Sequence, residues 1–198
     1  MPPDDGDSYL YLDSDVLRNK PGLRSADALA RFEYERAAWR LDEMRRWPPP
    51  DRFDLEELKR LHGHIFQDVY DWAGSIRTVD IAKAGQMFCR PAFLEGEGKR
   101  LAEALAKENL LRGLDRPAFI GRLAEHYGDW NALHPFRDGN GRSTRELFRQ
   151  LASQAGYELD LTKIERDAWN EASARSFKGD TKPLRDVLAV TVRPYRST

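Results

Sequence analysis

One twelve-residue stretch, HPFRDGNGRSTR at positions 134–145, holds side chains and small residues that could do chemistry together. Gly139, Asn140 and Gly141 allow backbone N–H groups to converge on an anion, and a helix expected just after them adds its N-terminal dipole. Arg142 and Arg145 lie three residues apart, so on a helix they share a face and can both reach one polyphosphate. The pattern predicts a phosphate-binding loop.

A carboxylate and an imidazole belong to the same stretch. Asp138 is a hard oxygen ligand, suited to Mg²⁺ shared between one carboxylate and substrate phosphates. His134, with an ordinary pKa of about 6.5, is largely neutral at cellular pH and can take a proton from a hydroxyl. Each residue also has a plainer interpretation: a structural histidine, a capping aspartate, a glycine turn or a solvated arginine face. Their occurrence together favours a site for nucleotide, metal and base.

The segments on both sides of this loop have the three-and-four spacing of buried helices. Before it, the spacing covers residues 115–133, and after it the apolar positions continue to Gly156, which is a suitable stop. Further helices are expected over residues 25–46, 54–72 and 92–111, then from about 162 and over a last segment near 184–190. The sequence predicts an all-α bundle of roughly seven helices, with an N-terminal arm at 1–24 and a single domain at 25–198.

Helix starts are marked by capping residues. Good N-caps are serine and aspartate, and a glutamate three residues later completes a capping box. The expected caps are Ser25, Asp54 with Glu57, Asp115, and Thr162 with Glu165.

Residues 75–91 break the helical period with β-branched side chains, which predicts a two-stranded flap as the only β structure. Two strands alone are marginal in water, so the hairpin must lie against the helices or a partner. Ile76, Val79 and Ile81 are β-branched positions of this segment, and Met87 and Phe88 follow in its second half. The alternative is a hairpin that simply covers an edge of the core.

Bulk composition excludes several classes of protein. The 198 residues carry a net charge of −1, which argues against nucleic acid as the direct ligand. The single cysteine, Cys89, allows no intrachain disulfide and no cysteine-based zinc cluster. Neither a signal peptide nor a membrane-spanning apolar run is evident. A soluble intracellular protein is expected, although export by a machine that reads other signals would leave no trace in these features.

The sequence HPFRDGNGR resembles the signature of the Fic family, His-x-Phe-x-Asp/Glu-Gly-Asn-Gly-Arg, and Arg145 matches a second arginine that follows it in many members. The likeness extends from about Tyr9 to the last helix and includes the flap and the YLYLDSDVLRNK stretch. It implies a Fic-type helical bundle with an active-site loop at 134–142.

The resemblance also implies an activity: transfer of AMP from ATP to a Tyr, Ser or Thr hydroxyl of a target protein. His134 would be the base, Asp138 would hold Mg²⁺, the 139–141 amides would form the anion hole, and Arg142 and Arg145 would bind the outer phosphates. The flap would dock the target by strand addition, and the candidate contacts are Ile76, Val79, Ile81, Met87 and Phe88. Both glycines of the loop are kept, which separates the chain from the phosphorylating Doc branch. Phosphocholine transfer also occurs on this fold, and a catalytically silent interaction protein remains the alternative of another class.

Many Fic proteins are inhibited by a Ser/Thr-x-x-x-Glu-Gly/Asn motif whose glutamate reaches the second motif arginine. Here glutamate precedes Gly or Asn only at Glu95, Glu97 and Glu108, and no Ser or Thr lies four residues before any of them. The hypothesis is therefore that a small separate antitoxin supplies the glutamate to Arg145, which makes this chain the toxin of a toxin–antitoxin pair; an uninhibited effector is the alternative.

Residues outside the loop offer weaker candidates. His62 and His64 lie two apart, a poor spacing for one helix face, and are expected at the surface or the core edge. Trp169 and Asn170 lie on a helix that could border the nucleotide base.

Overall fold

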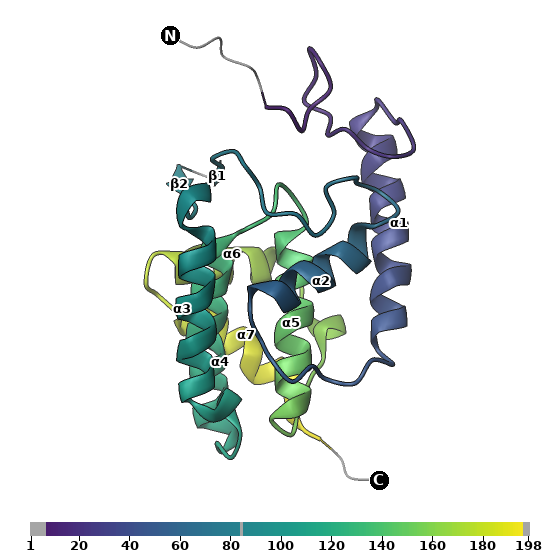
Figure 1. Ribbon diagram of the computed structural model, residues 1–198. Coiled ribbons are helices and arrows are strands. Elements are labelled where there is room, and N and C mark those ends of the chain that lie inside the picture. The colour runs from purple at the N-terminus through teal and green to yellow at the C-terminus, as the bar shows by residue number, and fades with distance from the viewer. Residues whose placement is uncertain (1–6, 84, 196–198) are drawn as a thin grey trace.

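The structure, a computed structural model, describes residues 7–83 and 85–195, and helices dominate this part of the chain (Figure 1). Seven α-helices occur in it, which confirms the all-α bundle. Their bounds are α1 Ala26–Met44, α2 Leu55–Phe66, α3 Leu94–Lys107, α4 Arg116–Leu133, α5 Asn140–Gln154, α6 Arg166–Phe177 and α7 Lys182–Thr191. Three short 3₁₀ segments join them: η1 Pro91–Phe93, η2 Asn109–Leu111 and η3 Leu161–Lys163.

Two small antiparallel strand pairs accompany the helices. The flap consists of β1 (Ala82–Lys83) and β2 (Gln86–Met87). The second pair joins β3 (Tyr157–Leu159) to β4 (Val192–Pro194), and β3 follows α5 directly. The prediction that the flap is the only β structure is therefore wrong. Gly156 allows the turn into β3 because its φ is +89°, a left-handed value that favours glycine.

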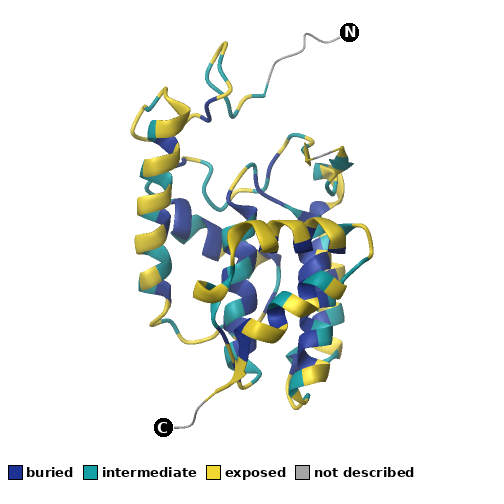
Figure 2. Ribbon diagram, turned by 180° about the vertical axis from the view of Figure 1, so that it is seen from behind, coloured by how far each residue is buried: buried dark blue, intermediate teal, exposed yellow. Residues whose placement is uncertain are grey.

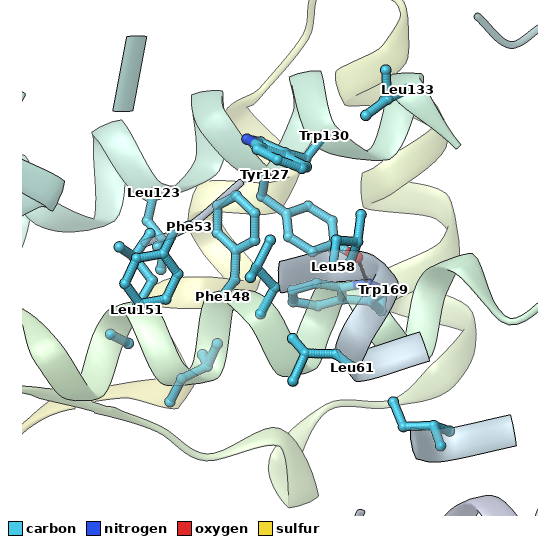
Figure 3. Close-up of a cluster of buried hydrophobic side chains, with 14 of the residues drawn as sticks. Phe53, Leu58, Leu61, Leu123, Tyr127, Trp130, Leu133, Phe148, Leu151 and Trp169 are labelled. Carbon is cyan, nitrogen blue, oxygen red and sulfur yellow. Dashed lines mark hydrogen bonds between the residues drawn. The ribbon is translucent and has the colours of Figure 1, made fainter. Parts of the chain in front are cut away.

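The core lies between α2, α4, α5 and α6, where large side chains interdigitate (Figure 3). Trp130 and Phe148 are buried, and Tyr127 packs edge-on against Phe148. Trp169 is also buried, and its indole N–H donates to the Tyr127 hydroxyl over 3.0 Å. Trp169 is thus a core residue, whereas Asn170 beside it on α6 is exposed, and that this helix borders the nucleotide base stays a prediction. Burial of each such side chain contributes about 1.5–3 kcal/mol.

Helix α1 lies at the side of the bundle, and most of its outer face is exposed (Figure 2). Of its nineteen residues, only Leu29, Ala37 and Met44 are buried. Across the described ranges, 7–83 and 85–195, no helix combines the length and the apolar character needed to cross a membrane.

Three of the four expected caps are present. The side chains of Ser25, Asp54 and Asp115 accept hydrogen bonds from the backbone N–H three residues on, as N-caps do. The prediction that Thr162 is an N-cap is wrong. Asp160 caps η3 instead, by accepting from the backbone N–H of Thr162, and α6 begins only at Arg166, after Ile164 in extended conformation.

Candidate active site

The loop between α4 and α5 turns sharply at both ends, and both turns use left-handed backbone. Helix α4 ends at His134, which has φ +48° and ψ +59°, a conformation rare for a residue with a side chain. Gly139, with φ +78°, is the N-cap of α5. A Cβ at Gly139 would lie only 2.3 Å from the Phe66 ring, so only glycine fits there. The loop backbone at Gly139 therefore packs directly against the Phe66 ring of α2.

Asn140 fastens the loop from inside. Its side-chain oxygen accepts from the Phe136 N–H over 2.8 Å, and its amide nitrogen donates to the Phe136 carbonyl over 2.7 Å. The side chain is buried, so these bonds are shielded from water. Asn140 thus shapes the loop with its side chain. Its role in the predicted anion site depends on its backbone N–H, together with that of Gly141, since the first N–H groups of a helix lack intrahelical partners.

His134 is held in a defined orientation. Its Nδ1 lies 3.2 Å from the Asn131 carbonyl, so Nδ1 carries the proton and Nε2 is left as the acceptor. The ring stacks on Phe88 of the flap, with centroids 3.8 Å apart. Burial lowers the pKa of His134 to about 4. The imidazole is therefore neutral at cellular pH, with Nε2 ready to take a proton.

Arg77 connects the flap segment to the loop, and sequence reasoning missed it. It is a buried cation, 1% exposed, whose guanidinium donates to the carbonyls of His134, Val79 and Cys89. Its backbone N–H donates to the Pro135 carbonyl over 2.8 Å. Burial lowers the pKa of Arg77. A charge of this kind is tolerated only when its donors are satisfied, as they are here.

Asp138 is an exposed residue just before the helix N-terminus. Its Oδ1 accepts from the Gly139 N–H over 2.5 Å, and the second oxygen has no protein partner among the described residues. No group of three or more His, Cys, Asp or Glu side chains suited to a metal occurs in the described ranges. This donor set fits Mg²⁺, which is commonly bound by one or two carboxylates plus substrate phosphates and keeps several waters.

Arg142 lies on the first turn of α5 and meets two other helical segments. Its Nη2 donates to Glu33 of α1 over 2.5 Å, and its guanidinium lies 4.5 Å from the Phe66 ring centroid. Glu33 also accepts from the Tyr70 hydroxyl. Burial and the Glu33 carboxylate raise the pKa of Tyr70. The partners Glu33 and Tyr70 carry no motif signal, and sequence reasoning missed both.

Comparison of the sequence with a family model and with known proteins identifies the family. The Fic/DOC family model matches residues 52–152. "Probable protein adenylyltransferase Fic" of Escherichia coli is 38% identical over 186 residues, which is 94% of this chain and 92% of that protein. The chain belongs to the Fic/DOC family. "Protein adenylyltransferase VbhT" of Bartonella schoenbuchensis is 37% identical over 94% of this chain and 38% of its own length.

Solved Fic structures share the fold over nearly their whole length. The BepC protein of Bartonella tribocorum, with bound AMPPNP, superposes with a TM-score of 0.88 at 25% identity, covering 95% of this chain and 97% of that one. An N-terminal Fic domain from Bartonella quintana, with bound ADP, gives 0.87 at 28% identity, covering 95% of each chain.

The second arginine of the Fic motif differs from the first in its surroundings. Within the described ranges, Arg145 has no carboxylate within ion-pairing distance, whereas Arg142 is paired with Glu33. The Arg145 guanidinium lies close to Gly141. A Cβ added at Gly141 would be 3.2 Å from Arg145 Nη1. Among the described residues, the carboxylate that pairs with one of these two arginines is thus Glu33 of α1, and it reaches Arg142.

The Fic flap is shorter than expected. Ile76, Val79 and Ile81 lie outside the strands, and Phe88 follows β2, although its N–H still donates to the Ile81 carbonyl over 3.2 Å. The side chain of Met87 is half exposed on β2. The cause is Arg77, which draws the backbone of 76–79 toward the loop instead of into a ladder.

A cavity of about 280 Å³ opens beside the flap, between α3, α4 and the end of α6. Phe88 lines this cavity and also stacks on His134, so one ring borders both the cavity and the base. Phe177 packs edge-on against Phe88 from α6. Asp129 lies in the lining, and burial raises the pKa of its carboxyl.

Proposed function

We propose that this chain is a protein adenylyltransferase that moves AMP from ATP to a hydroxyl side chain, Tyr, Ser or Thr, of a target protein. The observation that carries the proposal is the position of His134: a neutral imidazole with Nε2 available, at the start of the loop that ends in the α5 N-terminus. The names of the E. coli and Bartonella relatives agree with this activity.

The residues divide the reaction among them. His134 Nε2 takes the proton of the target hydroxyl as its oxygen forms a bond to the α-phosphorus, and the bond to the bridging oxygen of pyrophosphate breaks. The N–H groups of Asn140 and Gly141 would face the phosphate oxygens, where the helix dipole favours negative charge. The Gly139 N–H would join them by exchanging its bond to the Asp138 carboxylate for one to phosphate. Arg142 and Arg145 bind the outer phosphates. Asp138 would hold Mg²⁺, which when bound neutralises phosphate charge.

The target is expected to dock at the flap. Strands β1 and β2 are short and exposed, so an extended segment of another protein can add to their edge and satisfy its own backbone hydrogen bonds. Phe88 lies next to this edge and stacks on the His134 ring, so it connects the docking site to the base. The candidate contacts remain Ile76, Val79, Ile81, Met87 and Phe88.

The surroundings of Arg145 favour inhibition of this chain by a separate protein. Because this arginine has no carboxylate partner in the described ranges, a separate small protein can supply one and block the outer phosphates of ATP. The chain would then be the toxin of a toxin–antitoxin pair acting in the bacterial cytoplasm. The feature expected of the antitoxin is a glutamate whose side chain reaches Arg145.

The test is incubation of the purified chain with ATP, Mg²⁺ and a bacterial lysate, with the label on either the α- or the γ-phosphate. Transfer of the α-label alone supports AMP transfer, whereas transfer of the γ-label would mean phosphorylation. His134→Ala should abolish labelling and keep ATP binding. His64→Ala, a change on α2 away from the loop, should label like the wild type. Equal labelling by His134→Ala and wild type contradicts the proposal.

A further inference from the structure

His62 is a fully buried histidine in the middle of α2, at 0% exposure. Its expected place at the surface or core edge is therefore wrong. Three aromatic rings surround it: Phe136 stacks on it with centroids 3.8 Å apart, and Phe66 and Trp72 follow at 4.7 and 5.8 Å. Phe136 is itself a residue of the active-site loop. The imidazole is thus part of the packing beneath the loop rather than of the surface.

Both ring nitrogens of His62 are used. The Gly74 N–H donates to Nδ1 over 2.9 Å, so Nδ1 is the acceptor and Nε2 carries the proton. Nε2 lies 3.0 Å from the Asp138 carbonyl and therefore donates to it. Burial lowers the pKa of His62 to about 3, which agrees with a neutral ring. A core filler would need neither bond, since an apolar residue of similar size packs without them.

The two bonds join the turn after α2 to the loop that carries the chemistry. The turn packs closely against α2, because a Cβ at Gly74 would lie 3.1 Å from the Lys59 carbonyl of that helix. At the other end, the bonded carbonyl belongs to the peptide that leads into Gly139. The orientation of this peptide sets the direction of the next N–H groups and of the Asp138 side chain.

We propose that His62 is a positioning residue: through its Nε2–H bond to the Asp138 carbonyl it fixes the peptide that aims the 139–141 amides and the Asp138 carboxylate at the phosphates. The inference rests on the proposed AMP transfer and adds a residue outside the HPFRDGNGR stretch to the machinery. Small misplacements matter, because an error of about 1 Å in a reacting geometry can cost on the order of 100-fold in rate.

Two substitutions separate the two bonds of His62. In His62→Gln the amide nitrogen reaches the place of Nε2 and can donate to Asp138, while the acceptor for Gly74 is lost. In His62→Asn the side-chain oxygen reaches the place of Nδ1 and can accept from Gly74, while the bond to Asp138 is lost. Both variants lose the ring and its stacking alike, so their difference reports the Asp138 bond. His62→Leu loses both bonds, and His64→Asn on the same helix is the matched control.

The experiment measures kcat and KM for ATP in α-label transfer, together with ATP affinity by calorimetry and the amide shifts of Gly139 and Gly141 by NMR. We expect His62→Gln to keep kcat within about tenfold of wild type. We expect His62→Asn and His62→Leu to lose on the order of 100-fold. The Gly139 and Gly141 shifts should move in Asn and Leu and stay near wild type in Gln.

The result that overturns the inference is an equal loss of kcat in Gln and Asn, or in Gln and Leu should Asn fail to fold. Such an outcome assigns His62 to packing alone. An active wild type with inactive His62→Asn but unmoved glycine shifts overturns it as well. Absence of transfer in wild type itself contradicts the proposed function, and in that case the glycine shifts still decide whether His62 positions the loop.

Discussion

Two glycines of the active-site loop, two residues apart, are expected to respond to the same substitution in opposite ways. Gly139 has φ +78°, and a Cβ there would lie 2.3 and 2.5 Å from two carbons of the Phe66 ring. That ring is 0% exposed and cannot swing away. Left-handed backbone costs a residue with a side chain about 1–2 kcal/mol. Overpacking adds about 1–3 kcal/mol. Gly139→Ala should therefore lower the free energy of unfolding by roughly 2–5 kcal/mol.

Gly141 lies in the first turn of α5, and the three atoms nearest to a Cβ there belong to the end of the Arg145 side chain, the closest at 3.2 Å. A flexible side chain can move, and alanine is favoured over glycine in a helix by about 1 kcal/mol. Gly141→Ala should therefore unfold no earlier than wild type. It should lose transfer by tenfold or more, on the order of 1.4 kcal/mol, because Arg145 is displaced from the phosphates.

The assay is thermal unfolding followed by calorimetry, with α-label transfer measured on the same samples. At about 2–4 °C per kcal/mol for a chain of this size, Gly139→Ala should unfold about 4–20 °C below wild type. Gly121→Ala is the control: a Cβ at this position in α4 has nothing within 4 Å, so stability should rise slightly and transfer should not change. A Gly139→Ala variant that unfolds with wild type, or a fully active Gly141→Ala, refutes the reasoning.

Three further predictions concern charged groups of the site. With its pKa lowered to about 4, His134 stays neutral as the pH falls, so kcat/KM should be level from pH 8 to about pH 5 and decline below; an acid limb near 6.5, with ATP affinity measured at each pH, contradicts a buried base. Glu33→Gln should weaken ATP binding because Arg142 loses its ion pair, and increased transfer would instead mean that α1 inhibits the enzyme. Arg77→Met should destabilise the fold by about 3 kcal/mol or more, because three carbonyls lose a charged donor, and urea unfolding measures this.

The active-site loop could be predicted from sequence because its information is local. The apolar spacing on each side defines α4 and α5, and the glycines and Asp138 define the turn between them. The N-caps Asp54 and Asp115 are equally local, and both are present. The prediction for Thr162 was wrong for a local reason too: Asp160, two residues earlier, accepts from both the backbone N–H and the hydroxyl of Thr162, and so caps η3 instead.

The partners of the loop could not be predicted, because they come from distant parts of the chain. Glu33 lies 109 residues before Arg142, and His62 lies 76 residues before Asp138. Nothing in their neighbouring residues marks either one as part of a site. The predicted extent of the flap was wrong for a related reason. Ile76 and Val79 have strand propensity, but Arg77 between them donates hydrogen bonds to the loop carbonyls. Strand propensity gives way where a buried cation fixes the backbone.

The distant residues share one physical task, which is to hold backbone carbonyls of the loop. Arg77 bonds the carbonyls of His134 and Pro135, from its side chain and its backbone respectively. Asn140 and His62 donate to two further loop carbonyls, those of Phe136 and Asp138. The backbone is thus tied at both ends and in the middle by buried donors.

Such ties leave the reacting side chains free. Because the bonds that hold the loop are made to its backbone carbonyls, His134 Nε2 and the second oxygen of Asp138 keep their capacity for the substrate and its metal. Preorganised dipoles do not have to reorient during the reaction, which is the largest electrostatic advantage that a site can have. It follows that substitutions at the tying residues should change rate more than ATP affinity, whereas substitutions at Arg142 and Arg145 should change affinity at least as much.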